Sequence, residues 1–241
     1  TLFPYTTLFR SCERHPRLVN LSTRLVLKVT ALLIVIGTVA VMVFEWNGVL
    51  AEHSSWWGRF STAFFTGVTP RTAGFNVVDY GSLTVPTLMV TLLLMYIGAS
   101  PGSTGGGIKT TTFAVATLNI FATARGRRRI EFSGREISNL SIRRAFAAIV
   151  LSLVFLGLSI TTIASLEKGV GLMPIAFECF SAFSTVGLSM NLTGQLGDPA
   201  RIALVLVMFV GRVSALTLLV GVLRQVNVSP YRYPKEDILI N

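Results

Sequence analysis

Residues 181–189 of this chain read Ser-Ala-Phe-Ser-Thr-Val-Gly-Leu-Ser, and residues 69–76 read Thr-Pro-Arg-Thr-Ala-Gly-Phe-Asn. Both stretches hold a Thr-x-Gly element followed by an apolar residue and then a polar one. Glycine in such an element lets the backbone adopt left-handed or extended conformations that turn successive carbonyl oxygens to one side. A single Thr-x-Gly element is usually no more than a turn, so its meaning depends on what surrounds the two copies.

The two copies belong to an internal repeat. A shift of 113 residues places Thr72 on Thr185 and Gly74 on Gly187. The same shift aligns further pairs along the two halves of the chain: Ala63 and Phe64 with Ala176 and Phe177, Leu83 with Leu196, Pro86 with Pro199, Met95 with Met208, Gly98 with Gly211, and Thr104 with Thr217. Glycine, threonine and proline matches at one offset are hard to obtain by chance in an apolar chain, so we infer a tandem repeat.

The composition indicates an integral membrane protein. Of the 241 residues, 51% are hydrophobic and only 13% are charged, and the mean hydropathy is +0.65. A soluble globular domain has about 25% charged residues. Three apolar runs, 25–44, 145–166 and 200–223, are long enough to cross a bilayer, because about 20 helical residues span about 30 Å.

Four shorter apolar segments complete the predicted topology. Segments 83–97 and 110–124 are each too short to cross and are separated by the Gly-rich stretch 98–107, so we predict one crossing that is broken in its middle. Segments 56–67 and 173–184 are amphipathic and suit re-entrant half-helices. The fold class we expect is an all-α membrane protein with two tandem span, half-helix, loop and span repeats. Non-helical backbone at membrane depth is tolerated only where it lines water or is buried in protein, so the broken crossing is a candidate site.

The net charge of +10, from 21 Lys and Arg against 11 Asp and Glu, is mostly a topology signal. With four crossings, both chain ends and the loop 125–144 lie on one side of the membrane. That side carries 15 of the basic residues: Arg10, Arg14, Arg17, Arg24, Lys28, Arg125, Arg127, Arg128, Arg129, Arg135, Arg143, Arg144, Arg224, Arg232 and Lys235. By the positive-inside rule this side is cytoplasmic, and we expect contact with the lipid bilayer rather than with nucleic acid.

The loops after the half-helices are the candidate ion site. A ring of backbone carbonyl oxygens can replace the hydration shell of a cation, and the negative C-terminal end of a half-helix favours a cation beside it. Thr-Val-Gly followed by an apolar and a polar residue approximates the filter of potassium channels, so potassium is the only metal expected there. The candidate filter residues are Thr72, Ala73, Gly74, Phe75 and Asn76 in the first segment and Thr185, Val186, Gly187, Leu188 and Ser189 in the second.

These stretches resemble the Trk/Ktr/HKT superfamily of potassium transporters, and are most like its Ktr-type membrane subunits. The resemblance covers about residues 15–241 and rests on residues 69–76, 98–110 and 181–189, with the tail 231–240. Family members have four repeats around a pseudo-fourfold pore, so the resemblance implies that this chain holds the third and fourth. The implied division is a segment 1–14 that is an artefact or cytoplasmic, a pore repeat 15–124, a basic cytoplasmic loop 125–144, a pore repeat 145–226, and a cytoplasmic tail 227–241.

The resemblance also implies a gate below the filter. The gate residues would be Gly102, Ser103, Thr104, Gly105, Gly106 and Gly107 of an intramembrane loop, together with Lys109 and Arg212. An alternative pairs Arg212 with Glu178, and others treat the loop as a plain hinge or as a phosphate-binding loop. The sequence departs from the family pattern at Ser214 and Ala215, where Gly and Pro are usual.

The expected function is potassium uptake through this filter by a protein that is not an enzyme. The resemblance implies a homodimer on a cytosolic nucleotide-binding regulatory ring of the KtrA/TrkA kind, in the cytoplasmic membrane. Potassium would be the transported ion and sodium a stimulating or symported ion, with no cofactor. The alternatives are a complete two-repeat cation channel whose dimer supplies four filter segments, and a nucleotide-binding membrane enzyme that uses the Gly-rich loop.

Overall fold

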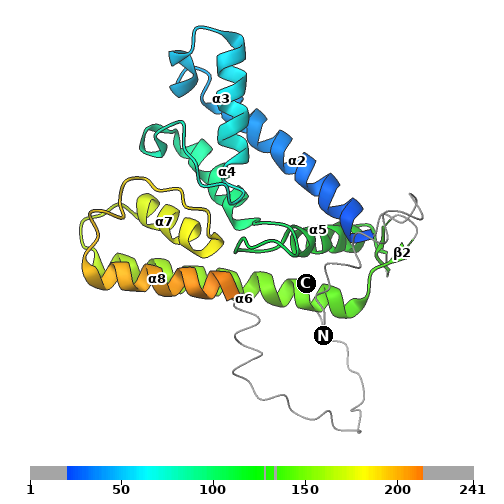
Figure 1. Ribbon diagram of the computed structural model, residues 1–241. Helices are drawn as coiled ribbons and strands as arrows, with labels where there is room; N and C mark the ends of the chain where they lie inside the picture. Colours follow the sequence, from blue (N-terminus) through cyan, green and yellow to red (C-terminus); the bar gives the residue numbers. More distant parts are fainter. Residues whose placement is uncertain (1–20, 128, 133–134, 214–241) are drawn as a thin grey trace, which may run out of the picture.

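The computed structural model describes residues 21–127, 129–132 and 135–213. Its helices, labelled as in Figure 1, are α2 (Leu21–Phe44), α3 (Trp56–Val68), α4 (Val85–Tyr96), α5 (Thr110–Ala124), α6 (Asn139–Leu166), α7 (Leu172–Ser184) and α8 (Asp198–Val213). Two short 3-10 helices, η1 (Val49–Glu52) and η2 (Tyr80–Ser82), lie in the connections. The predicted tail 227–241, the segment 1–14, and positions 214–223 of the last apolar run, with Ser214, Ala215 and Thr217, lie outside the described residues.

The two longest helices fit membrane crossings. Helix α2 has 24 residues and α6 has 28, which at 1.5 Å per residue gives about 36 and 42 Å. Within the described part of the chain, these two are the helices that are long and apolar enough to span a membrane. Leu27, Val43, Leu158 and other large apolar side chains on them are exposed. Both helices begin several residues before the predicted runs 25–44 and 145–166.

The predicted broken crossing is two helices and a loop. Helix α4 ends at Tyr96 and α5 begins at Thr110, and the only ladder contact of the loop between them is an isolated parallel bridge from Ile97 to Ile108. The Ile108 N–H donates to the Tyr96 carbonyl at 3.2 Å. The chain therefore leaves and re-enters helical structure within a Gly-rich stretch that could not continue a helix without cost.

The described residues fit the predicted all-α class apart from one short hairpin. Strands β1 (Glu131–Phe132) and β2 (Arg135–Glu136) form an antiparallel hairpin in the basic loop. Two side-chain contacts support it. Arg129 forms an exposed ion pair with Glu136 at 3.8 Å, and the Lys28 ammonium lies 5.3 Å from the ring centre of Phe132. Strands of two residues are too short to leave a period in the sequence, which is why the hairpin was not predicted.

The helices pack as two groups that meet at α4 and α5. In the first group, α2 contacts α3, α4 and α5, and in the second, α6, α7 and α8 contact one another. The two groups are joined by the contacts of α4 with α7 and of α5 with α6. Figure 1 shows α6 and α8 lying along each other with α7 beside them. Each half-helix, α3 or α7, is therefore held against the long span that precedes it in the chain.

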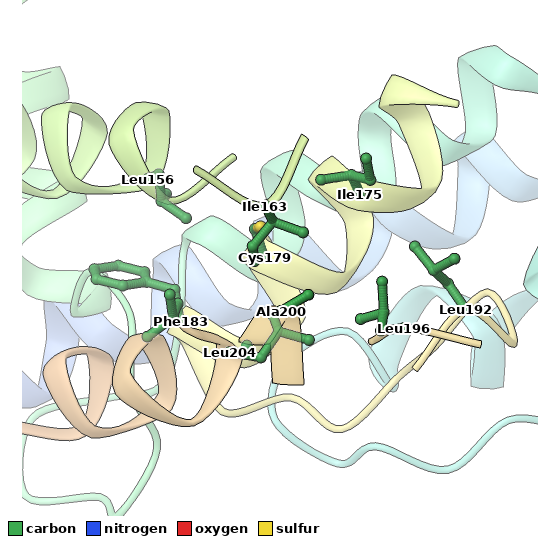
Figure 2. Packing of buried hydrophobic residues seen from close by; sticks show 11 residues of the cluster. Leu156, Ile163, Ile175, Cys179, Phe183, Leu192, Leu196, Ala200 and Leu204 are labelled. Carbon is green, nitrogen blue, oxygen red and sulfur yellow. The ribbon is translucent and has the colours of Figure 1, made fainter. Parts of the chain in front are cut away.

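The larger apolar core surrounds α7 (Figure 2). Its buried members come from α6, α7, α8 and the connection before α8: Leu156, Ile163, Ile175, Cys179, Ala182, Phe183, Leu192, Leu196, Ala200, Leu204 and Val207. Cys179 is a free cysteine that is fully buried in this core. A second cluster joins the two groups, with Tyr80 and Met95 packed against Phe177 and Val186.

A buried carboxylate fixes the start of α4. Glu45 follows α2 and is fully buried. Its Oε1 atom accepts hydrogen bonds from the Thr84 N–H at 2.8 Å, the Thr84 hydroxyl at 2.7 Å and the Thr87 hydroxyl at 2.7 Å. Because Thr84 is the N-cap of α4, this carboxylate supplies the acceptor that the first turn of the helix needs.

Candidate functional site

The first candidate filter segment begins where α3 ends. Thr72 and Gly74 have φ angles of 67° and 76°, in the left-handed region. The Thr69 carbonyl accepts from the N–H groups of Ala73 at 3.1 Å and Gly74 at 3.3 Å, and the Thr69 hydroxyl donates to the Phe75 carbonyl at 2.5 Å. A non-glycine residue at positive φ persists only where its surroundings impose it, so these bonds hold the segment in a costly conformation.

The second segment repeats this geometry after α7. Thr185 has φ 54° and ψ 42°, and Gly187 has φ 92°. The Val186 N–H donates to the Ser181 carbonyl at 2.9 Å. Among the residues that the structure describes, only Thr72, Thr185 and Asn191 are non-glycine residues with positive φ. The two threonines that the sequence shift aligns therefore share a rare backbone conformation, which sequence alone could not give.

The two segments approach each other through their backbones. A Cβ atom placed on Gly74 would lie 2.2 Å from the Val186 carbonyl oxygen, and one on Gly187 would lie 3.7 Å from the Gly74 Cα. A cavity of about 300 Å³ lies along the second segment, and its lining includes Thr185 through Ser189. The sequence-predicted residues of both segments are thus brought together, with carbonyl oxygens as their shared chemistry.

A buried glutamate supports the second segment. Glu178 of α7 is 6% exposed, and its carboxylate accepts from the Ser189 hydroxyl, from the Met190 N–H at 3.2 Å and from the Thr193 hydroxyl at 2.9 Å. Sequence reasoning considered Glu178 only as a possible partner of Arg212, and the structure does not pair them. The sequence does contain a signal for this role, because Glu178 is a carboxylate inside an apolar half-helix, seven residues before the Thr-x-Gly element that begins at Thr185.

An arginine behind the first segment was also missed. Arg71 lies next to Thr72, and its Nη1 donates to the Thr30 carbonyl of α2 at 3.3 Å. The Arg71 Nε and the Thr30 hydroxyl are buried, and neither has a hydrogen-bond partner among the described residues. In the second repeat, Ser184 is the residue that aligns with Arg71. The two segments are therefore supported by different side chains although their backbones are alike.

The Gly-rich loop lies directly against both segments. The Gly106 N–H donates to the Thr185 hydroxyl oxygen at 2.7 Å. A Cβ on Gly105 would lie 3.0 Å from the Thr72 methyl carbon, and one on Gly107 would lie 3.0 Å from the Ser184 hydroxyl oxygen. The loop backbone thus fits against Thr72, Ser184 and Thr185, where the two segments begin, without room for side chains.

Two basic side chains bind this loop. The Arg212 guanidinium donates to the Thr104 carbonyl, and the Lys109 ammonium donates to the Gly105 carbonyl. The alternative in which Arg212 pairs with Glu178 is wrong, because each side chain bonds to other groups. Of the remaining predicted gate residues, Ser103 accepts from the Gly105 N–H at 3.1 Å, while a Cβ on Gly102 would meet nothing within 4 Å. Gly102 therefore lies in the exposed part of the loop, away from the two segments.

Comparison with known proteins gives the family. Residues 10–228 match the TrkH family, described as a cation transport protein family. This chain is a TrkH-family protein. The potassium/sodium uptake protein NtpJ of Enterococcus hirae is 36% identical over 92% of this chain and 50% of its own length. The Ktr system potassium uptake protein B of Bacillus subtilis is 37% identical over 97% of this chain and 53% of its own length.

A solved structure has the same fold. The crystal structure of the potassium transporter TrkH from Vibrio parahaemolyticus superposes with a TM-score of 0.71 at 19% identity, over 91% of this chain and 48% of that one. The TrkH-family chain described here thus has a membrane transporter fold, and its family is one of transport proteins rather than enzymes. The chain spans about half the length of the curated relatives it matches.

Proposed function

We propose that this chain forms part of a potassium-conducting pore in the cytoplasmic membrane, with Thr72–Asn76 and Thr185–Ser189 as two segments of its selectivity filter. The observation that carries the proposal is the shared backbone geometry, in which a left-handed Thr and a left-handed Gly follow each half-helix. This conformation can present consecutive carbonyl oxygens to a dehydrated cation. Two close relatives are named for the uptake of potassium, or of potassium and sodium, which supports potassium as the ion and leaves room for sodium as a stimulating ion.

The Gly-rich loop is the gate in this proposal. It lies against the inner ends of both segments, and Lys109 and Arg212 hold it there through backbone carbonyls. A seated loop would obstruct the path below the filter, and its two attached positive charges would repel an approaching cation. Flux then requires the loop to leave this position.

The complete transporter would contain more than this chain supplies. We propose four filter segments around one pore, a homodimer of such pores, and a cytosolic nucleotide-binding ring of the KtrA/TrkA kind that contacts the basic loop 125–144. Both chain ends would be cytoplasmic, on the side that carries most of the basic residues.

Potassium uptake by a chimera tests the filter. In this chimera, residues 15–241 replace the matching segment of the Bacillus subtilis Ktr system potassium uptake protein B, and the host cells lack potassium uptake. We expect growth at low potassium, and we expect Gly187→Ser to raise sodium uptake relative to potassium, because serine at φ 92° distorts the segment. Gly194→Ser is the matched control, because a Cβ there meets nothing within 4 Å. A chimera without uptake, or an unchanged ion ratio in Gly187→Ser, would contradict the filter assignment.

A further inference from the structure

The Thr185 hydroxyl lies where the candidate filter and the Gly-rich loop meet. We propose that this hydroxyl serves the loop and the innermost cation position in turn, so that seating of the loop and binding of potassium at that position weaken each other. The inference rests on the proposed function and adds a mechanism of regulation to it. It assigns to Thr185 a role beyond that of a filter ligand, and to Gly106 a role beyond that of a flexible hinge.

The hydrogen bond between the two elements is short and specific. The Gly106 N–H donates to Thr185 Oγ1 at 2.7 Å, at the short end of the range for N–H···O bonds. Thr185 is also the first residue of the second filter segment and lines the cavity of about 300 Å³ beside it. One side chain therefore borders both the candidate ion path and the loop.

The backbone of the loop is shaped to make this bond. A Cβ on Gly106 would lie 2.8 Å from the Phe183 carbonyl oxygen, 2.9 Å from the Thr185 methyl carbon and 3.1 Å from the Gly211 carbonyl oxygen. Any side chain at this position would push the loop away from α7 and α8. The glycine is thus required for the N–H group to reach the hydroxyl, rather than for a turn, because its φ angle is not positive.

Charge works in the same direction as the hydrogen bond. Arg212 and Lys109 bond to the carbonyl groups of Thr104 and Gly105, the two residues immediately before Gly106. When the loop is seated, the positive end of the Gly106 N–H dipole points at Thr185 Oγ1 and two cationic side chains lie close by. A potassium ion that used the same hydroxyl oxygen as a ligand would meet repulsion from all three groups.

Thermodynamic linkage makes the effect reciprocal. If a seated loop lowers the affinity of the innermost position for potassium by some factor, bound potassium must destabilise the seated loop by the same factor. Occupancy of the filter by the transported ion would therefore favour an open gate. A cation that does not bind there would leave the loop seated.

Hydrogen–deuterium exchange of the Gly106 amide measures this coupling directly. The complete chimera is purified in lipid nanodiscs, and exchange of the peptide that covers residues 104–108 is followed in potassium chloride and in choline chloride at equal ionic strength. We expect exchange to be faster in potassium by about fivefold or more, in the range of typical coupling factors. Exchange that is equally slow in both salts would overturn the proposal.

Two variants that differ only by the hydroxyl provide the matched comparison. Thr185→Ser keeps the oxygen, and Thr185→Ala removes it, while both lose the same methyl group. We expect Thr185→Ser to retain slow exchange in choline and its acceleration by potassium, and Thr185→Ala to exchange rapidly in both salts. The same potassium response in both variants would show that the hydroxyl does not carry the coupling.

A loop variant keeps the test independent of changes in the filter. Gly106→Ala leaves Thr185 intact but prevents the loop from taking its seated position. We therefore expect higher potassium uptake and loss of the salt-dependent exchange. Gly194→Ala adds the same methyl group in open space and should behave like the unsubstituted chimera. If the chimera takes up no potassium, the proposed function fails. If it takes up potassium while Gly106 exchange ignores the salt, only the present inference fails.

Discussion

Gly211 of α8 lies against the carbonyl group of Phe183 at the end of α7, so closely that a Cβ on Gly211 would be 1.9 Å from that oxygen. The last turn of the half-helix and the following span thus meet backbone to backbone. This contact sets the depth at which Arg212, the next residue, reaches the Gly-rich loop. It also fixes the position of Thr185, which follows the last turn of α7 by one residue.

The first prediction concerns this contact. Gly211→Ala should lower the free energy of unfolding by about 1–3 kcal/mol, because neither backbone can move to make room without displacing a packed helix. The measurement is the thermal midpoint of the purified chain in detergent. Gly157→Ala on α6 is the control, since a Cβ there meets nothing within 4 Å and alanine favours a helix. Equal midpoints for the two variants would mean that α8 is not seated on α7 as described.

The second prediction concerns the support of the second candidate filter segment. Glu178→Ala leaves the hydrogen-bond donors of Ser189, Met190 and Thr193 without their acceptor. Each donor that stays buried without a partner lowers the free energy of unfolding by about 1–3 kcal/mol. We expect the chimera with this change to discriminate less between potassium and sodium. Glu178→Gln should retain most of the discrimination, because the amide oxygen can still accept from Ser189 and Met190.

Ion ratios in rubidium, potassium and sodium uptake assays check this second prediction. Glu167→Ala is the matched control. That glutamate accepts from the Gly197 N–H at 2.6 Å, near the start of α8, and touches neither segment. A Glu178→Ala chimera with the parent ion ratio would show that the carboxylate supports folding alone.

The sequence predicted the helices well and their supports poorly. The half-helix 173–184 differs from α7 by one residue at its start, because apolar periodicity and the following Thr-x-Gly element are both local signals. The bond from Arg71 to Thr30 and the bonds of Glu178 to residues 189–193 depend on how the chain returns on itself, which one sequence does not encode locally. The close fit of Gly105–Gly107 is of the same kind. Glycines that permit a loop and glycines that permit a contact look identical in sequence.

The third prediction uses the buried carboxyl group of Glu45, which lies directly after the C-terminal end of α2. Burial raises the pKa of this group, but the hydrogen bonds from Thr87 and Thr84 lower it by more, so its pKa in the folded protein lies below the ordinary 4.5. A carboxyl group with a lowered pKa contributes stability that is present above its unfolded pKa and is lost as the pH falls through the folded value. Glu45→Gln should therefore be less stable than the parent at pH 7, and the difference should shrink as the pH falls below about 4.5.

Thermal midpoints measured across this pH range check the third prediction. The control is Glu52→Gln on η1, which makes the same change of charge at an exposed position. A difference between Glu45→Gln and the parent that stays constant down to low pH would contradict the assignment. So would an equal pH dependence for both glutamine variants.

The fourth prediction concerns the cationic anchor of the loop. A hydrogen bond to a charged group contributes about 1.5–3 kcal/mol, so Arg212→Ala should raise the population of the unseated loop by about tenfold or more. In the proposed pore this appears as higher potassium uptake at a given membrane potential, with an unchanged ratio of potassium to sodium, because the filter segments are untouched. Potassium uptake by Arg212→Lys should lie between that of the parent and that of Arg212→Ala. The lysine side chain is shorter, so its ammonium can bond to the Thr104 carbonyl only if α8 shifts.

Arg201→Ala on the same helix is the control for the fourth prediction. Arg201 bonds the Gly194 carbonyl at 2.9 Å at the opposite end of α8, and its removal takes away the same charge without touching the loop. Uptake is measured for all three variants at equal amounts of protein in the membrane. Parent-like uptake in Arg212→Ala would mean that the guanidinium does not hold the loop in its seated position. A rise in Arg201→Ala equal to that in Arg212→Ala would assign the effect to the net charge of the helix instead.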